Sequence, residues 1–333
     1  STFKINIPTP IMAGVRTPLR QFASCVLVDS DDTLDSIFSS DMAIGRYVAQ
    51  RAGIGINAGR IRGLGAKIRG GEVQHTGVIP FLKKFEATVR SCTQNGVRGG
   101  SATVHFPIWH QEINDIIVLK NNKGTEDNRV RKLDYSIQLS KLFYERFLKN
   151  EEITLFSPHD VKGLYEAFGT PQFDELYEKY ERATSIPKTK VSARELFTAI
   201  LKERAETGRI YIMNIDHCNS HSSFTDKVNM SNLCQEITLP TDPISHIDGE
   251  GEIALCILSA INVGIIKLDE LSNLCDLAVR GLEELIDYQQ YPVEAAERST
   301  LARRSLGIGY IGLAHFLAKN KVKYDDPEAH KLV

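Results

Sequence analysis

The sequence predicts an α/β fold with a largely parallel sheet. Short apolar runs that are typical of buried strands recur along the chain, for example at 21–28 and 253–258. They alternate with amphipathic stretches that are long enough for helices, for example at 34–51 and 268–291. Strands that alternate with helices in this way form βα units, in which consecutive strands run parallel.

The composition is that of a globular protein with a sizeable core. Of the 333 residues, 42% are hydrophobic and 25% are charged, and the formal net charge is −2. This balance lacks the electrostatic footprint of a nucleic-acid or membrane-surface binder. The longest apolar run, 253–266, is too short to span a bilayer, and residues 1–7 lack the apolar region of a signal peptide. We therefore expect a cytoplasmic protein that binds neither nucleic acid nor a membrane.

The first third of the chain predicts a strand, a helix and a loop. Pro8 and Pro10 favour an extended entry over 5–11 rather than a helix. A strand over 21–28 leads into an acidic turn that caps a helix over 34–51. The glycine-rich stretch 52–65 that follows is expected to be a loop, either one that suits an anion such as a phosphate or a mobile surface loop.

The remaining elements follow from periodicity and from cap residues. Ser192 opens a capping box that begins a helix, and Gly208 ends that helix. The expected strands are 153–156, 209–213 and 253–258; the expected helices are 81–89, 133–148, a helix from 157 that Gly169 ends, 173–183, 268–291 and 303–319; and 121–128 is expected to be a turn.

An amide, a thiol and a carboxylate stand within five residues at Asn232, Cys234 and Glu236. In an extended chain they point to the same side, because the side chains of a strand repeat every second residue. The amide can hydrogen-bond a substrate, the thiol can carry a thiolate or a thiyl radical, and the carboxylate can take a proton. The plain alternative is a loop with a buried cysteine between two solvated polar residues.

The six cysteines, at 25, 92, 218, 234, 256 and 275, show no spacing typical of a metal site. We expect no metal ligand among them, nor in the stretch from His217 to His221. Cys92 and Cys275 are expected to be inert thiols in helix cores. In a reducing compartment a disulfide that does form is usually catalytic, which draws attention to a cysteine beside polar residues.

Two stretches rich in glycine and arginine, 52–71 and 93–100, favour a phosphorylated ligand. Glycines allow the backbone to approach a ligand closely, and guanidinium groups bind phosphates. The first stretch is not a dinucleotide fingerprint, because no helical pattern opens after its glycines.

Several motifs in order resemble the catalytic large subunit of class Ia ribonucleotide reductases. They are 24–27, 50–62, 119–122, 231–236 and 254–256, and the resemblance runs from end to end. It implies that 1–333 is a portion of that family's ten-stranded α/β barrel, with the catalytic cysteine on a finger loop inserted through the barrel. The family's ATP-binding cone and its C-terminal redox-active tail are not expected within these residues. The βα pattern runs on towards Val333, so we expect another polypeptide to complete the barrel and the chain to be inactive without it.

The resemblance also implies a role for each reactive residue. Cys234 becomes a thiyl radical that removes the 3′-hydrogen of the ribose, Glu236 takes the 3′-OH proton, and Asn232 binds the sugar. Cys25 protonates the departing 2′-OH, and Cys25 and Cys256 deliver two electrons and end as a disulfide. That pairing requires Cα atoms closer than about 7 Å.

Binding residues carry over in the same way. The positions that resemble substrate contacts are Thr9, Ser24, Gly53, Asn232 and Glu236; those that resemble the deoxynucleotide effector site are Asp32, Thr33, Leu34, Arg62 and Arg69; and Gln94 and Arg98 resemble the loop that relays the effector to the substrate.

The implied partners are a ribonucleoside diphosphate substrate, a deoxynucleoside triphosphate effector with Mg, thioredoxin or glutaredoxin, the remainder of the large subunit and a second copy of the chain. The radical is expected from a metal cofactor on a small subunit, with no cofactor bound by this chain. Two alternatives remain open. One is an adenosylcobalamin-dependent reductase, and the other is a non-catalytic nucleotide-binding module for regulation or assembly.

Overall fold

The computed structural model describes residues 2–93 and 99–333 and divides into two compact units. The central unit comprises 25–254 with 292–296, and the terminal unit comprises 1–24, 255–291 and 297–333. The predicted relay residues Gln94 and Arg98 lie outside the described residues.

The central unit is built on a parallel sheet. Its strands, in spatial order, are β2 (Cys25–Asp29), β3 (Gly53–Asn57), β6 (Ala102–Pro107), β7 (Asp134–Leu139) and β10 (Ile210–Asn214). Every neighbouring pair in this series is parallel. The predicted α/β class and parallel sheet are therefore confirmed.

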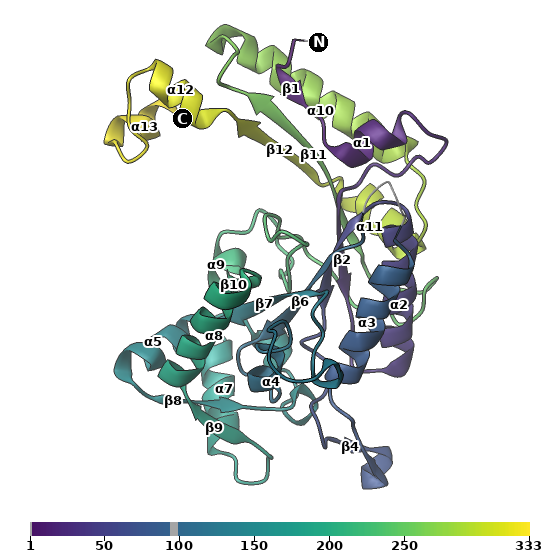
Figure 1. Cartoon of the computed structure of the whole chain (residues 1–333), viewed down its shortest axis with the longest axis vertical. Helices are drawn as coiled ribbons and strands as arrows, with labels where there is room; N and C mark the ends of the chain where they lie inside the picture. Colours follow the sequence, from purple (N-terminus) through teal and green to yellow (C-terminus); the bar gives the residue numbers. More distant parts are fainter. Residues whose placement is uncertain (1, 94–98) are drawn as a thin grey trace. The chain divides into compact units, whose positions relative to one another are not determined.

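Helices cover one face of this sheet. Helices α2 (Leu34–Ala49) and α3 (Ile79–Ser91) lie side by side, and α2 contacts β2 and β3 (Figure 1). Helices α5 (Lys141–Lys149) and α8 (Ala193–Thr207) pair in the same way, and α8 contacts β10. The strands supply apolar side chains at alternate positions, such as Ile54 and Ile56 on β3, and small or polar ones between them.

The predicted helix caps are confirmed. The Thr33 hydroxyl accepts the Ser36 N–H at the start of α2, and the Ser192 hydroxyl accepts the Glu195 N–H at the start of α8. Gly208 ends α8 in the left-handed conformation that glycine adopts without a steric penalty.

Two predicted elements, the glycine-rich loop and the helix over 133–148, begin with a strand instead, so both predictions are wrong for their first residues. Residues 53–57 form the buried strand β3. Residues 134–139 form β7, and helix α5 begins only after its N-cap, Ser140. In both cases polar or small residues alternate with apolar ones and are buried by other parts of the unit. Strand β6 was not among the predicted elements.

Smaller elements complete the central unit. The predicted helix from 157 to Gly169 is instead a 3-10 turn (Pro158–Asp160) followed by α6 (Leu164–Ala167), because Gly163 adopts a left-handed φ between them. The remaining elements are the hairpin β4 (Lys67–Ile68) and β5 (Val73–Gln74) around a 3-10 turn (Arg69–Gly71), α4 (Ile113–Ile116), a 3-10 turn (Glu126–Asn128), α7 (Phe173–Arg182), the hairpin β8 (Glu152–Leu155) and β9 (Thr189–Ser192), and α9 (Ile215–Ser220).

The terminal unit has its own strands and helices. Strand β11 (Ala254–Asn262) pairs antiparallel with β1 (Ile5–Asn6) and parallel with β12 (Leu306–Ile311). Helix α10 (Leu271–Tyr288) packs on β12, and α12 (Leu313–Lys319) and α13 (Pro327–Leu332) follow. Helix α11 (Glu294–Arg303) begins in the central unit and ends in the terminal one.

Two predictions are wrong in the terminal unit. Helix α1 (Thr9–Gly14) forms where the prolines predicted an extended chain. Pro8 is its N-cap and Pro10 lies in its first turn, where no backbone N–H is needed. The predicted helix over 303–319 is a strand, β12, followed by α12, and Gly312 separates them with φ at +78°. Among the described residues, no helix is both long enough and apolar enough to cross a membrane.

Candidate active site

Residues 230–240, here called the cysteine loop, contact all the strands of the central sheet on the face that carries the small and polar side chains. The strands supply these contacts one by one: Cys25 Sγ on β2 to the Asn232 amide (3.2 Å), Gly55 on β3 against the Ser231 carbonyl, the Thr103 hydroxyl on β6 to the Leu233 carbonyl (2.6 Å), Ser136 Oγ on β7 to Gln235 Oε1 (2.5 Å), and the Ile212 carbonyl on β10 to Gln235 Nε2 (2.7 Å).

Asn232 organises this loop. Its side-chain Oδ1 accepts the backbone N–H groups of Glu236 and Ile237, both at 3.1 Å, and Gln235 takes a left-handed φ of +61°. The chain therefore turns here, so it is not the extended stretch in which the three side chains would share one side. Asn232 is buried, whereas Cys234 and Glu236 are exposed.

The turn brings Asn232 and Glu236 to Cys25. Asn232 Nδ2 donates to Cys25 Sγ at 3.2 Å, and the same sulfur donates to Glu236 Oε1 at 3.7 Å. A thiol thus lies between an amide donor and a carboxylate acceptor, an arrangement that can move a proton between sulfur and oxygen. Cys234 stands on the turn itself, between the amide and the carboxylate in sequence.

Glycines on β3 leave room for the loop. A Cβ on Gly55 would lie 2.1 Å from the Ser231 carbonyl oxygen, so no larger residue fits without displacing the loop. Gly53, a predicted substrate contact, is the register partner of Cys25 and lies against the Leu233 side chain. The alternation of glycine and isoleucine over 53–56 is the signal that could have predicted this close approach.

Three residues under the loop were missed: Thr103, His105 and Ser136. Each stands on the polar face of β6 or β7, and its polar character at alternate positions of a strand is the signal that could have found it. Burial lowers the pKa of His105 to about 4, and the neighbouring backbone of Asn232 and Ser231 partly offsets this effect.

The other predicted substrate residues and the second predicted redox cysteine lie in the terminal unit. Thr9 opens α1, Ser24 precedes β2, and Cys256 lies buried on β11. Their roles stay predictions.

Two predicted effector residues bind each other. Asp32 accepts the backbone N–H and the Nε–H of Arg62, each at 2.8 Å. His159 Nδ1 lies 3.5 Å from the same carboxylate. Burial raises the pKa of Asp32, and the hydrogen bonds and charge of Arg62 oppose this. The pair ties the start of α2 to the glycine-rich segment.

The remaining predicted effector residues surround this pair. Thr33 is the N-cap of α2, Leu34 is exposed beside it, and Arg69 is exposed at the tip of the β4–β5 hairpin. Sequence reasoning missed Glu112, whose carboxylate accepts the backbone N–H groups of Leu64 and Val78. Burial raises the pKa of Glu112 to about 7. One carboxyl group therefore binds the backbone on both sides of the β4–β5 hairpin, at Leu64 and at Val78.

A profile described as "Ribonucleotide reductase, barrel domain" matches residues 23–333. The chain belongs to the ribonucleotide reductase barrel family. The predicted barrel origin of the α/β architecture is therefore confirmed.

Individual members of the ribonucleotide reductase family align with all or nearly all of the chain. The ribonucleoside-diphosphate reductase subunit alpha of Haemophilus influenzae is 62% identical over 339 residues, covering 100% of this chain and 45% of that protein. Subunit alpha of reductase 1 from Escherichia coli strain K12 is 58% identical and covers 100% of this chain and 44% of that protein. The subunit alpha of Enterobacteria phage T4 is 48% identical over 98% of this chain. The chain thus spans less than half the length of these relatives.

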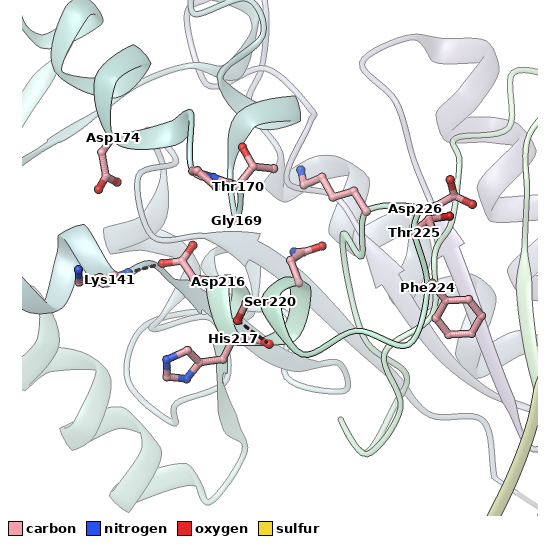
Figure 2. A pocket seen from close by; sticks show the side chains of 13 residues that line it. Lys141, Gly169, Thr170, Asp174, Asp216, His217, Ser220, Phe224, Thr225 and Asp226 are labelled. Atoms are coloured by element: carbon pink, nitrogen blue, oxygen red, sulfur yellow. Dashed lines mark hydrogen bonds between the residues drawn. The ribbon is translucent and has the colours of Figure 1, made fainter.

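A separate pocket of about 620 Å³ lies in the central unit of this reductase-family chain (Figure 2). Asp174, Asp216 and His217 line it, and Asp216 Oδ2 accepts the backbone N–H of Lys141 at 2.5 Å. No predicted site residue lines this pocket, so it is distinct from the cysteine loop.

In residues 2–93 and 99–333, no group of three or more His, Cys, Asp or Glu side chains is placed to hold a metal ion. Cys92 and Cys275 are half-buried at the end of α3 and on α10, so the prediction that they lie in helix cores is wrong.

Proposed function

We propose that this chain is the part of a ribonucleoside-diphosphate reductase catalytic subunit that holds the reactive thiols. The observation that carries the proposal is the contact of Cys25 with both Asn232 and Glu236. The relatives named above are reductases, which supports the same reaction class.

The proposed reaction replaces the ribose 2′-OH by hydrogen. Cys234, as a thiyl radical, takes the 3′-hydrogen while Glu236 takes the 3′-OH proton, and Cys25 protonates the 2′-OH, which leaves as water. Cys25 and Cys256 together supply two electrons and two protons and end as a disulfide. Cys234 returns the hydrogen it removed and is a thiyl radical again, and Glu236 returns its proton to the 3′-oxygen. Asn232 holds the sugar and, from its position beside Cys25, keeps that thiol next to Glu236.

Several partners belong to this proposal. A small subunit with a metal cofactor supplies the radical that Cys234 receives, the remainder of a large subunit completes the barrel, and thioredoxin or glutaredoxin reduces the disulfide. A deoxynucleoside triphosphate with Mg binds near Asp32, Thr33, Leu34, Arg62 and Arg69, and Gln94 and Arg98 relay its identity to the substrate. We propose that a second copy of the chain pairs with the first, because Leu34, Phe38 and Met42 are exposed at four-residue spacing on one face of α2.

The test is a reconstituted assay of ribonucleoside diphosphate reduction with the small subunit, the rest of the large subunit and a thioredoxin-type reductant. Cys234→Ser should abolish product formation, whereas Cys218→Ser, on α9, should leave it intact. Retained turnover in Cys234→Ser would refute the catalytic reading in favour of a nucleotide-binding module. Turnover with adenosylcobalamin in place of the small subunit would assign the chain to the cobalamin-dependent class instead.

A further inference from the structure

Asp29 ends strand β2, which Cys25 begins. Residues four apart in a strand lie on the same face, so Asp29 and Cys25 both face the cysteine loop. The Asp29 side chain has no exposed surface. It was not among the residues that the sequence singled out.

Four donors converge on this carboxyl group. Asn57 Nδ2 (2.7 Å) and Arg60 Nε (3.4 Å) donate to Oδ1, and Asn229 Nδ2 (3.4 Å) and Thr241 Oγ1 (3.3 Å) donate to Oδ2. Both oxygens of Asp29 only accept hydrogen bonds, whereas a protonated carboxyl group would have to donate one. The Asp29 side chain is therefore an ionised carboxylate. Burial raises the pKa of Asp29, and the Arg60 charge and the Asn57 amide oppose this.

Two of these donors flank the cysteine loop, one on each side. Asn229 precedes the loop and Thr241 follows it, and Asn229 Nδ2 also donates to the Thr241 carbonyl at 3.3 Å. On the leading side, the Asn229 carbonyl accepts Gln138 Nε2 from β7 at 2.6 Å. The two ends of the loop therefore meet at Asp29, on the strand that carries Cys25.

The chemistry explains why this position suits an aspartate. Each carboxylate oxygen receives two donors, so an asparagine would turn its NH₂ group towards one of the two donor pairs. Arg60 also forms an ion pair with Glu166 at 2.8 Å, so Asp29 is not the only carboxylate that neutralises the Arg60 charge.

We propose that Asp29 is a positioning residue, which holds Asn229 and Thr241 together and thereby sets Asn232 and Glu236 against Cys25. This inference rests on the proposed function, because it gives Asp29 a part in the reaction of the same thiols.

The test compares two substitutions of Thr241 by hydrogen exchange of the Glu236 and Ile237 amides, which report the loop because both donate to Asn232. Thr241→Val keeps the shape of the buried side chain but removes the hydroxyl, and Thr241→Ser keeps the hydroxyl but removes the methyl. Because a hydrogen bond to a charged group is lost, Thr241→Val should speed exchange roughly tenfold, and Thr241→Ser should leave it near the unsubstituted rate. The reverse order would show that packing, and not the bond to Asp29, holds the loop, and would overturn the proposal.

The matched control is Thr154→Val, which removes a buried hydroxyl that donates to Glu181 at 2.6 Å in another part of the central unit. It should leave exchange of Glu236 and Ile237 unchanged. Asp29→Asn should speed their exchange as Thr241→Val does, and unchanged exchange in both of these variants would overturn the proposal.

In the reconstituted reductase, Thr241→Val should lower turnover roughly tenfold while Thr241→Ser restores it. Faster exchange with full turnover would refute the catalytic part of the proposal. Turnover that survives Cys234→Ser would refute the proposed function, and the exchange measurements would still decide whether Asp29 holds the loop.

Discussion

Asn232 donates its side-chain amide to the sulfur of Cys25 at 3.2 Å, although the two residues are 207 positions apart. The orientation of the amide is determined by its other end, because Oδ1 accepts the N–H groups of Glu236 and Ile237. The NH₂ group must then face the thiol. One side chain therefore sets both the turn of the cysteine loop and the hydrogen bond to Cys25, the first of the two proposed redox cysteines.

Cys25 and Cys256 should be joined by a disulfide after one turnover of the reconstituted reductase without external reductant. The reason is that these two thiols are the proposed source of the two electrons. Peptide mapping by mass spectrometry under non-reducing conditions measures the link. Cys25→Ser should block repeated turnover and leave effector affinity intact, and product formed with both thiols still reduced would contradict the assignment.

Arg62→Ala should weaken binding of a deoxynucleoside triphosphate roughly tenfold or more, because a charge-assisted contact is worth about 1.5 to 3 kcal/mol. Isothermal titration calorimetry measures the affinity. Arg131→Ala serves as the control, since that residue is also an arginine paired with a carboxylate, that of Glu126, in the same unit. Equal affinity in the Arg62 variant and the unsubstituted protein would exclude Arg62 from the effector site.

Gly55→Ala should displace the cysteine loop, because the added Cβ would lie 2.1 Å from the Ser231 carbonyl oxygen. We expect a loss of stability of about 1 to 3 kcal/mol, as for other overpacked buried sites, measured by urea unfolding. Gly281→Ala on α10 is the control, because nothing lies within 4 Å of its Cβ position and alanine favours a helix. A Gly55 variant as stable as that control would mean that the loop does not rest on β3.

His105 should make the fold sensitive to acid. Its pKa is lowered to about 4 by burial, from an ordinary value near 6.5, so protons bind the unfolded chain first as the pH falls. This contribution to stability is complete above pH 6.5 and is lost progressively between about pH 6.5 and 4, by up to roughly 3 kcal/mol.

His105→Phe removes that titration and should flatten the pH dependence of the free energy of unfolding over this range. Urea unfolding at several pH values measures the slope, and His330→Phe, at an exposed histidine, should leave it unchanged. An identical slope in His105→Phe and the unsubstituted protein would contradict the prediction.

The sequence could predict elements whose signals are local. Thr33, Ser192 and Gly208 cap their helices through neighbours in the chain, so α2 and α8 are found where expected. The polar face of β7 could not be read in this way, because Ser136 and Gln138 are buried by contacts with Gln235 and Asn229, which lie about a hundred residues further on. Without those partners, the alternation resembles an amphipathic helix.

In the candidate active site, too, some features could be predicted from the sequence and others could not. Resemblance indicated Asn232, Glu236 and Cys25, and the structure brings these three together. The turn at Gln235 and the anchor at Asp29 depend on distant hydrogen bonds, which no local pattern encodes.

The contacts of the cysteine loop join residues far apart in the sequence, and this separation implies when they form during folding. Its hydrogen bonds extend back 130 residues to Thr103 and 99 residues to Ser136, besides the one to Cys25. Contacts of such long sequence separation form late, because the entropy of closing the intervening chain must first be offset by the assembled strands. During synthesis Cys25 leaves the ribosome long before Asn232, since the N-terminal part of a chain emerges first. A nascent or partly folded chain therefore carries Cys25 without its hydrogen bonds to Asn232 and Glu236, which form only once the cysteine loop lies on the sheet.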